Sequence, residues 1–368
     1  MRIVQVIQKP QRRGAEIFTV QLSGQMSKQG HEVLLVSVFT GPGGISYSGE
    51  WVKMERRLSQ RFYDFKAWSL LSKLIESWKP DLIQANAADT LKFTVFSKIF
   101  FRWKIPIIYR NANQMGDFIK NGFHRRFNQF LINQVSAVAS VSKASKEDIH
   151  CSFSFPINRS RVLPIGIETN SVNHLANGDI SIQLPESFLL QIGGLVEEKA
   201  PLAMLSIFVK LQKKYTWLKL LYVGSGSLES VLRKEIAVQG LDESVSILPS
   251  QSNIFPILSK AFALVMPSKI EGLPGVILEA MYCRVPVIAF GVGGIPEVLK
   301  NGETGWCIAP GQADDFLAAI EDVISADSKL KSQIFDKAHQ LVNNSFNIEK
   351  ITRQFEGFYN EILFQNSV

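Results

Sequence analysis

The sequence predicts an α/β protein with two domains, each built around a parallel β-sheet. The chain has 368 residues, 46% of them hydrophobic, and a chain of this length usually divides into two domains of about 150–180 residues. Short β-rich runs alternate with longer helical patterns, and this alternation is typical of βαβ units. The alternation breaks off at residues 168–186, which are rich in Asn, Ser, Gly and Pro, and then begins again. The same kind of domain is therefore expected twice.

Five buried strands are expected in the N-terminal half, where short apolar runs recur. Between the first two runs, residues 15–28 carry apolar side chains at helical spacing and end near Gly30, which predicts a helix. The expected strands are residues 3–8, 32–38, 81–84, 107–109 and 137–141.

The C-terminal half shows the same pattern of apolar runs and helical segments. Open parallel sheets bind ligands in the crevice at the carboxyl ends of their strands, and two such domains would enclose a cleft. Functional residues are therefore expected on the loops that follow the strands. The expected strands are residues 188–192, 218–223, 245–248, 262–266 and 286–290.

The charge is distributed unevenly along the chain. Lys and Arg together number 40 and Asp and Glu 33, which gives a net charge of +7. Residues 1–180 hold 24 basic and 13 acidic side chains (24 − 13 = +11), whereas residues 181–368 hold 16 and 20 (16 − 20 = −4). The two halves are therefore expected to have different electrostatic roles.

Two segments of the basic half, residues 91–104 and 117–131, combine basic and aromatic side chains. One interpretation is a pair of core helices whose lysines are solvated. The other is a surface that docks on anionic lipid. No recognised nucleic-acid motif accompanies the charge, so nucleic acid is not an expected partner.

Targeting signals and metal-binding patterns are not evident in the sequence. The first apolar run stops at Lys9, and no 18 consecutive apolar residues occur, so neither a secretory signal nor a transmembrane helix is expected. The three cysteines, Cys151, Cys283 and Cys307, are widely spaced, which fits a reducing compartment and shows no zinc spacing. We therefore expect a cytoplasmic protein without a metal site, either free or peripheral at the inner face of the membrane.

The segment 262–283 carries the most functional information. It reads as a buried strand, a loop that contains Glu271, and a helix that begins near Pro274. Glycines just before a helix let backbone N–H groups approach an anion, and the helix dipole favours a phosphate there. Glu279 follows Glu271 by eight residues (279 − 271 = 8). The two carboxylates could therefore bind hydroxyl groups at the two ends of an extended ligand.

This segment resembles the Glu-x7-Glu motif of the family 4 retaining glycosyltransferases. Further segments that resemble the family's motifs occur in the same order over most of the chain. They are residues 13–16, 162–168, 193–199, 223–226, 291–297 and 301–305.

The resemblance implies the GT-B fold, in which two Rossmann-like domains face each other across a cleft. It also implies that the last helix crosses back onto the first domain. The expected domains are residues 1–172 with 348–368, which would bind the acceptor, and residues 173–347, which would bind the nucleotide-sugar donor.

The resemblance also implies roles for particular residues. Glu279 should bind the ribose of a nucleotide and Glu271 the hydroxyl groups of the donor sugar. Lys199 should neutralise the departing diphosphate, so Glu271 and Lys199 are the expected catalytic residues. The remaining residues expected at the donor are Gly14, Gly193, Leu248, Gly272, Leu273, Pro274 and Gly275.

The chain departs from the family in its cations. Relatives usually carry an arginine where this chain has Gly194. Arg12, Arg13 or Arg110 could substitute for that arginine from the other domain.

The chain also differs from the family at positions where relatives carry histidine. Asn86 and the segment that contains Asn111 stand where many relatives have histidine, so no catalytic base is assigned. Arg13, Asn86, Arg110 and Asn111 are the candidates for the acceptor side.

The expected function is therefore a retaining, metal-independent transfer of a sugar from a UDP- or GDP-sugar to a saccharide or lipid-linked acceptor. The pathway would be surface polysaccharide or glycolipid biosynthesis, with no cofactor besides the donor. Two alternatives stay open. One is a GT-B-fold sugar-nucleotide epimerase, and the other is a degenerate scaffold subunit that binds a sugar nucleotide without turnover.

Overall fold

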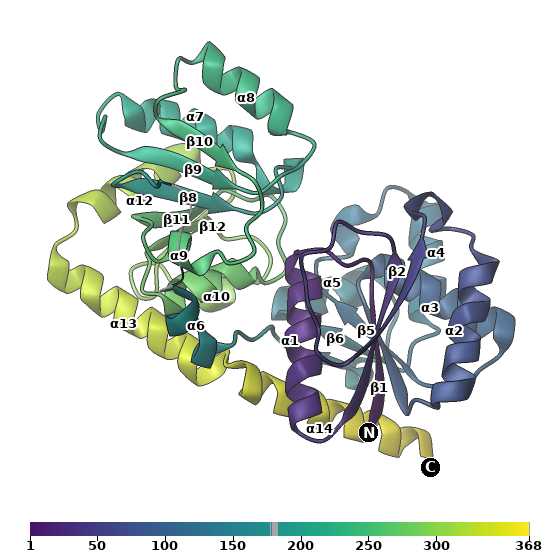
Figure 1. Cartoon of the computed structure of the whole chain (residues 1–368). Helices are drawn as coiled ribbons and strands as arrows, with labels where there is room; N and C mark the ends of the chain where they lie inside the picture. Colours follow the sequence, from purple (N-terminus) through teal and green to yellow (C-terminus); the bar gives the residue numbers. More distant parts are fainter. Residues whose placement is uncertain (177, 179–182, 368) are drawn as a thin grey trace. The chain divides into compact units, whose positions relative to one another are not determined.

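The computed structural model describes residues 1–176, 178 and 183–367, and the chain forms two compact units (Figure 1). Unit 1 consists of Met1–Gly166 and Ile348–Val368, and unit 2 of Ile167–Asn347. The domain boundary expected after residue 172 falls inside helix α6 (Thr169–Ala176), which belongs to unit 2.

Unit 1 contains a seven-stranded parallel sheet in the order β3-β2-β1-β4-β5-β6-β7. The five strands expected from the sequence are present. β3 was not expected, because it is a polar edge strand without a buried run. The resemblance of residues 162–168 implies a strand there, and the structure places the short strand β7 earlier, so that the two overlap only at Val162. The strands are β1 Arg2–Ile7, β2 Glu32–Phe39, β3 Glu50–Arg56, β4 Leu82–Asn86, β5 Ile107–Asn111, β6 Ala137–Ser140 and β7 Ser160–Val162.

Helices cover both faces of this sheet, as the alternating side chains of β1 show. Val4 packs in a core cluster with Trp68 of α2, whereas the next residue, Gln5, donates to the hydroxyl of Tyr359 on α14 at 3.4 Å. The C-terminal helix α14 therefore completes one face of unit 1. The helices are α1 Gly14–Lys28, η1 Leu58–Gln60, α2 Phe65–Trp78, α3 Ala88–Phe101, η2 Gly116–Phe118, α4 Gly122–Ile132, α5 Lys143–Ser152, η3 Ile157–Arg159 and α14 Ile348–Ser367.

Unit 2 contains a six-stranded parallel sheet in the order β10-β9-β8-β11-β12-β13. Numbered within the unit, this is the 3-2-1-4-5-6 order of a dinucleotide-binding Rossmann sheet. The order reverses between β8 and β11, and ligands of such sheets bind beside that point. The strands are β8 Phe188–Ile192, β9 Lys219–Val223, β10 Val245–Leu248, β11 Ala263–Met266, β12 Val287–Phe290 and β13 Trp306–Ile308.

The helices of unit 2 pack on a core that extends from β8 to α13. Most of them follow a strand directly, so each strand end at the carboxyl edge leads into a loop and then a helix N-terminus. They are α6 Thr169–Ala176, η4 Glu197–Lys199, α7 Pro201–Gln212, α8 Glu229–Val238, α9 Phe255–Leu258, α10 Gly275–Tyr282, α11 Ile295–Val298, α12 Ala313–Ser325 and α13 Ser328–Ser345.

The part of the chain that the structure describes contains neither a helix that could span a membrane nor a cluster of metal-binding side chains. No helix in it is both long enough and apolar enough to cross a bilayer. Within the same residues, no three His, Cys, Asp or Glu side chains come together in a group that could hold a metal ion.

Candidate active site

Lys199 and Glu271 are in direct contact at the carboxyl edge of the unit 2 sheet. Lys199 ends η4 in the loop after β8, and Glu271 lies in the loop after β11, the neighbouring strand. The Lys199 Nζ lies 2.5 Å from the Glu271 Oε1, and the two side chains are 28% and 5% exposed. The structure thus brings together the two residues that the sequence predicts as catalytic. The Lys199 ammonium is therefore accessible to solvent, whereas the Glu271 carboxylate is buried.

The backbone around Lys199 is held from several sides. The Gln191 side chain of β8 donates to the Lys199 carbonyl at 2.8 Å, and the Lys269 N–H donates to the Glu198 carbonyl at 2.8 Å. Lys269 also forms an ion pair with Glu197, so several contacts join the loops after β8 and β11 besides the Lys199–Glu271 pair. This scaffold orients Lys199 toward Glu271.

The glycines of residues 291–297 support Glu271 from another strand end. The Gly294 N–H donates to the Gly272 carbonyl at 2.5 Å. Gly293 has a φ of +57°, and a Cβ there would overlap the carbonyl oxygen of Glu271. The segment 291–297, which resembles a family motif, therefore has a packing role, because Gly293 lets the loop after β12 approach the backbone of the Glu271 loop.

Gly193, Gly224 and Leu248 connect the ends of three adjacent strands. The Gly193 N–H donates to the Val223 carbonyl at 3.0 Å, and the Gly224 N–H donates to the Leu248 carbonyl at 2.9 Å. Gly224 has a φ of +152°, and a Cβ there would overlap the Gly193 carbonyl. Gly193 and Leu248, both predicted at the donor, therefore lie on one continuous edge with Lys199.

Replacing Gly224 with alanine is expected to lower the free energy of unfolding by about 2–4 kcal/mol, because it combines an unfavourable φ with a backbone clash. Gly194→Ala is the matched control. A Cβ at Gly194 would meet its nearest atom, in Val196, at 3.6 Å, which is ordinary contact. Urea denaturation of both variants checks the prediction, and equal losses would contradict it.

The N-terminus of α10 adjoins Glu271. Pro274 precedes the helix with extended backbone angles (φ −75°, ψ 124°), and no side chain caps the first turn. The first N–H groups of a helix have no partner within it, so they can donate to an anion. Glu279 lies on the second turn and is half-buried. Burial, with a smaller contribution from the Glu279 charge, raises the pKa of Cys283 to about 12. Leu273 is buried, and Gly275 begins the helix half-buried.

The acceptor-side candidates of unit 1 have different environments. Arg13 is exposed at the start of α1, next to the exposed Gly14. Asn86 and Asn111 lie at the carboxyl ends of β4 and β5, and their side chains are buried. The Asn86 amide donates to Gln5 at 2.9 Å, and the Asn111 amide donates to the Ser145 carbonyl at 3.0 Å.

Arg110 is also buried, at 1% exposure, inside unit 1. Its guanidinium carbon lies 4.4 Å from the centroid of the Phe18 ring, and its Nε and Nη1 have no hydrogen-bond partner among the residues that the structure describes. Burial lowers the pKa of Arg110 to about 10, against the attraction of Tyr359 and Glu16. Of the four acceptor-side candidates, only Arg13 is exposed in this structure.

Sequence reasoning missed two supporting side chains. Gln191 holds the backbone of Lys199, and Gln5 belongs to the buried network around Asn86. A signal for both was present. Each glutamine interrupts an otherwise apolar strand, and a polar residue in a buried strand needs a hydrogen-bond partner.

Two family comparisons cover most of the chain. The family described as glycosyl transferases group 1 matches residues 178–345, and glycosyltransferase family 4 matches residues 12–171. The chain belongs to this family of group 1, family 4 glycosyltransferases, as its motifs predicted.

Curated relatives match over about half of their own length. The N-acetyl-alpha-D-glucosaminyl L-malate synthase of Bacillus anthracis is 29% identical over 189 residues, which is 50% of this chain and 48% of that protein. The capsular polysaccharide biosynthesis glycosyltransferase CapM of Staphylococcus aureus is 27% identical over 182 residues, 49% of this chain and 48% of that protein.

Solved structures match the whole chain in fold. Sucrose-phosphate synthase of Thermosynechococcus elongatus has a TM-score of 0.84 at 16% identity, covering 99% of this chain and 100% of that one. HepE of Anabaena in complex with UDP-glucose has a TM-score of 0.79 at 18% identity, covering 98% and 100%. At these identities the likeness concerns the fold, and it confirms the predicted α/β GT-B class.

Proposed function

We propose that this protein is a retaining glycosyltransferase that transfers a sugar from a nucleotide-diphospho-sugar to a saccharide or lipid-linked acceptor. The observation that carries the proposal is the Lys199–Glu271 pair beside the N-terminus of α10. A buried carboxylate can accept hydrogen bonds from sugar hydroxyl groups, and the accessible ammonium can contact a diphosphate. These are the two recognition tasks that a nucleotide-sugar donor requires.

Charge stabilisation is the main chemical requirement of this reaction. When the bond between the anomeric carbon and the diphosphate oxygen breaks, negative charge develops on the leaving group. Lys199 and the first N–H groups of α10 would stabilise that charge, with the positive end of the helix dipole contributing. We therefore propose that the transfer needs no metal ion.

The proposed stereochemistry is retention of the anomeric configuration. Neither Asn86 nor Asn111 can accept a proton from the acceptor, and both side chains are buried. In a front-side reaction the departing phosphate oxygen takes the proton of the acceptor hydroxyl while that oxygen attacks the anomeric carbon. This route needs the cationic site of unit 2 and no side-chain base.

The donor is proposed to be a UDP- or GDP-sugar, and the pathway surface polysaccharide or glycolipid biosynthesis. HepE, which shares the fold, has been solved with UDP-glucose, and CapM is named for capsular polysaccharide biosynthesis. A sugar-nucleotide-binding scaffold is the second candidate, because Gly194 removes one cation that relatives carry. The intact Lys199–Glu271 pair favours the enzyme over the scaffold.

A nucleotide-sugar screen tests the proposal. Thermal-shift measurements with UDP- and GDP-sugars should identify a donor that raises the melting temperature. Hydrolysis and transfer of that donor are then measured with wild type and Glu271→Ala, and NMR of the product shows the anomeric configuration. Donor binding without turnover against any acceptor would support the scaffold, and an inverted product would overturn retention.

Transfer is also expected to continue in excess EDTA, at a rate within about two-fold of the untreated enzyme, because a lysine and a helix terminus stabilise the leaving group without a metal. The assay uses the donor found in the screen, with and without a subsequent addition of Mg²⁺. A loss of activity that Mg²⁺ restores would contradict metal independence.

A further inference from the structure

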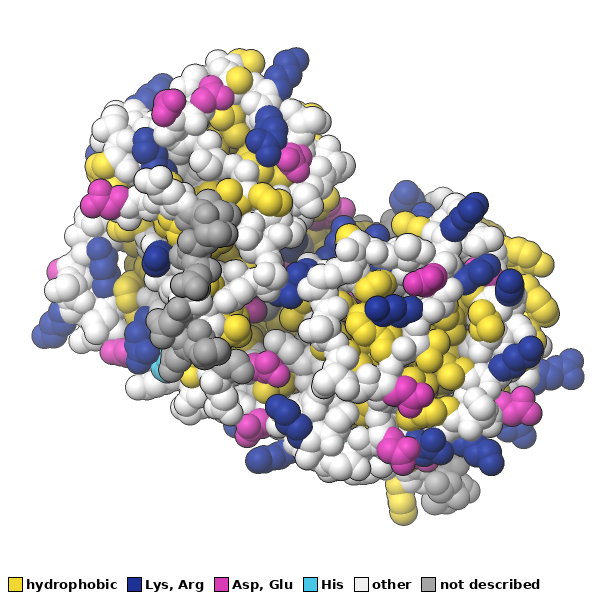
Figure 2. Space-filling model, viewed as in Figure 1, with side chains coloured by type: hydrophobic (Ala, Val, Ile, Leu, Met, Phe, Trp, Pro, Cys, Tyr) yellow, Lys and Arg dark blue, Asp and Glu magenta, His cyan; other side chains and the backbone are white. Residues whose placement is uncertain are grey.

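Large apolar side chains are exposed mainly on unit 1. Among the described residues, twelve exposed large hydrophobic side chains lie in unit 1 and four in unit 2. Figure 2 shows apolar side chains and Lys and Arg side chains close together over unit 1. The α2 face, as we name it, groups seven of these side chains around the start of α2 and the end of α3. They are Leu58, Phe62, Tyr63, Phe65, Leu70, Ile99 and Phe100.

Ring contacts make this face continuous between α2 and α3. The rings of Phe65 and Phe100 lie 5.9 Å apart, and Phe100 stacks on Trp68 at 5.1 Å. Trp68 in turn contacts Tyr63 at 5.7 Å. Tyr63 and Phe100 therefore pack on the buried ring of Trp68, and Phe65 packs on Phe100, so these side chains form one continuous surface.

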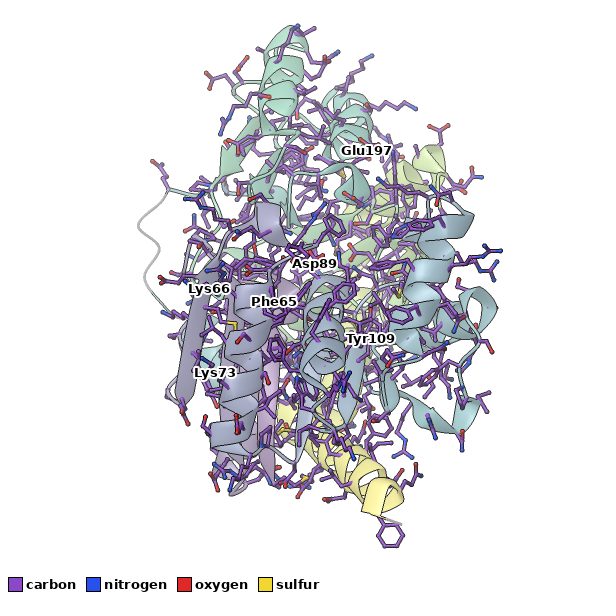
Figure 3. All side chains as sticks on the ribbon, turned by 90° about the vertical axis from the view of Figure 1, so that its right-hand side faces the viewer. Phe65, Lys66, Lys73, Asp89, Tyr109 and Glu197 are labelled. Atoms are coloured by element: carbon purple, nitrogen blue, oxygen red, sulfur yellow. The ribbon has the colours of Figure 1, made fainter. Side chains whose placement is uncertain are left out.

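The same face carries more cations than carboxylates. Lys66, Leu70 and Lys73 follow one another at helical spacing along the exposed side of α2, and Figure 3 shows Lys66 and Lys73 with Phe65 on this helix. Arg57 and Arg61 precede the helix and are also exposed. Over residues 57–78, which include all of α2, the sequence contains four Lys and Arg and two carboxylates (4 − 2 = +2), the buried Asp64 and the exposed Glu76 at the end of the helix. The face is therefore positively charged.

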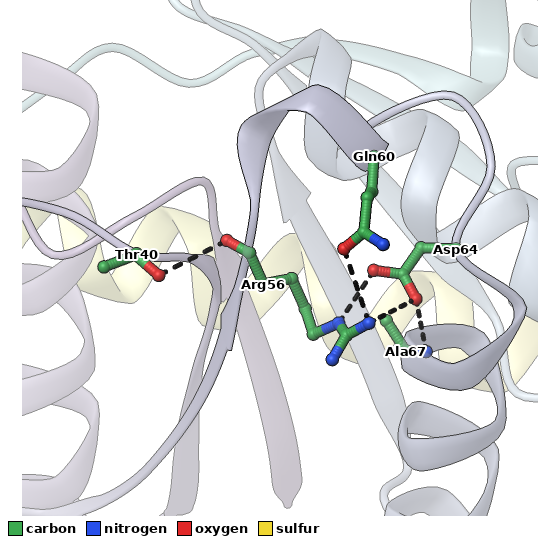
Figure 4. A network of polar contacts seen from close by, with 5 residues as sticks. All are labelled: Thr40, Arg56, Gln60, Asp64 and Ala67. Atoms are coloured by element: carbon green, nitrogen blue, oxygen red, sulfur yellow. Dashed lines mark hydrogen bonds and ion pairs between the residues drawn. The ribbon is translucent and has the colours of Figure 1, made fainter.

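That buried carboxylate, Asp64, anchors the turn that carries the aromatic residues (Figure 4). It accepts from the Arg56 Nε at 2.8 Å and from the Ala67 N–H at 3.0 Å, so it joins the end of β3 to the first turn of α2. The intervening turn projects Phe62 and Tyr63, which are 58% and 73% exposed. Two large aromatic side chains are thus held in solvent by a structured turn.

We propose that the α2 face docks unit 1 on a bilayer that contains anionic lipids. Aromatic and aliphatic side chains insert at the boundary between headgroups and acyl chains, while lysines and arginines contact the anionic headgroups. The apolar side chains of this face suit the boundary with the acyl chains, and its lysines and arginines suit the anionic headgroups. The proposal concerns a partner of unit 1 and does not depend on the identity of the sugar donor.

The ring contacts favour lipid over single-stranded nucleic acid. Base stacking needs free ring faces, but Phe100 already stacks on Trp68, and Phe62 contacts the Lys92 Nζ at 4.6 Å. Leu58, Leu70 and Ile99 add aliphatic area that bases do not stack on. A lipid interface needs neither free ring faces nor directed hydrogen bonds.

Vesicle sedimentation tests the proposal with the full-length protein and no donor. The vesicles are phosphatidylcholine alone or phosphatidylcholine mixed with phosphatidylglycerol, at low and high salt. One variant combines Phe62→Ser and Tyr63→Ser, and a second combines Lys66→Gln and Lys73→Gln. Matched controls on unit 2 are Val231→Ser with Val238→Ser and Lys329→Gln with Lys337→Gln, all at partly or fully exposed positions.

Wild type is expected to sediment with the anionic vesicles at low salt and to dissociate at high salt. The aromatic variant should bind about ten-fold more weakly, and the lysine variant about five-fold more weakly for each lysine removed. The unit 2 controls should bind like wild type. Unchanged melting temperatures show that the variants are folded, and the surface lysine variant keeps the test valid if the aromatic one is destabilised.

Three outcomes would overturn the proposal. The first is no sedimentation with anionic vesicles at low salt. The second is an equal loss of binding in the unit 2 controls, and the third is tighter binding to single-stranded RNA than to the vesicles with the same dependence on the α2 face. A protein that binds vesicles but transfers no sugar would refute the proposed enzyme and leave this inference intact.

Discussion

Replacing Lys199 with methionine is expected to lower the turnover number for sugar transfer by about 10²–10³-fold, the usual cost of removing one group that stabilises developing negative charge. Methionine keeps an unbranched side chain at this position and removes only the charge and its donors. The Lys199 Nζ is the accessible partner in its pair with Glu271. Its loss therefore removes the cation proposed to face the diphosphate.

Glu271→Gln is the reciprocal change and is expected to produce a loss of similar size. The amide keeps the size of the carboxylate but loses its charge, so it weakens both the contact with Lys199 and the hydrogen bonds to sugar hydroxyl groups. Because the two residues act as one unit, the double variant should lose much less than the product of the two single losses. Kinetic measurement of all four proteins with one donor gives this coupling.

The chain offers a matched control in the Lys269–Glu197 pair. This pair joins the same two loops, but its side chains are 57% and 68% exposed. Lys269→Met should therefore keep the turnover number within about two-fold of wild type, because exposed ion pairs contribute little. A loss as large as that of Lys199→Met would show that loop attachment, rather than charge at the site, determines the rate. Full activity of Lys199→Met would refute its catalytic role.

Most of the strands predicted from the sequence share one property, namely a mainly apolar run that is buried on both faces, as in β2; β10, with an exposed Ser246, is an exception. β3 escaped prediction because its side chains are exposed or half-buried along an edge. β7 and β13 have three residues each, which is too short for a pattern to be recognised. Sheet order was predictable only through the family resemblance, because the pairing of β8 with β11 depends on tertiary folding.

The candidate site also combines features that local sequence predicts with contacts that depend on tertiary folding. The position of Glu271 in a loop before a helix follows from glycine and proline spacing, and the structure places it there. Its contact with Lys199 joins residues 72 positions apart, so no local pattern specifies it. Asn86, Arg110 and Asn111 lie in the last residues of β4 and β5. The direction of each side chain depends on the pleat of the strand and on packing, and these bury all three.

Phe355→Ala is expected to lower the free energy of unfolding of unit 1 by about 3–5 kcal/mol, the usual cost of removing a buried phenylalanine side chain. Phe355 is fully buried on α14, and its ring lies 5.9 Å from that of Phe18 on α1 and 5.9 Å from that of Tyr359. A domain has only about 5–15 kcal/mol of stability in total. A change in the C-terminal helix should therefore destabilise the unit that begins at Met1.

Urea denaturation followed by tryptophan fluorescence measures this effect. Trp51, Trp68, Trp78 and Trp103 belong to unit 1, whereas unit 2 has two tryptophans, so the signal reports mainly on unit 1. Phe364→Ala on the same helix is the control, because that side chain is 74% exposed and its removal should change stability by less than about 0.5 kcal/mol. Equal shifts for the two variants would mean that α14 is not part of the unit 1 core. A larger shift for Phe355→Ala would confirm that α14 contributes to the core of unit 1.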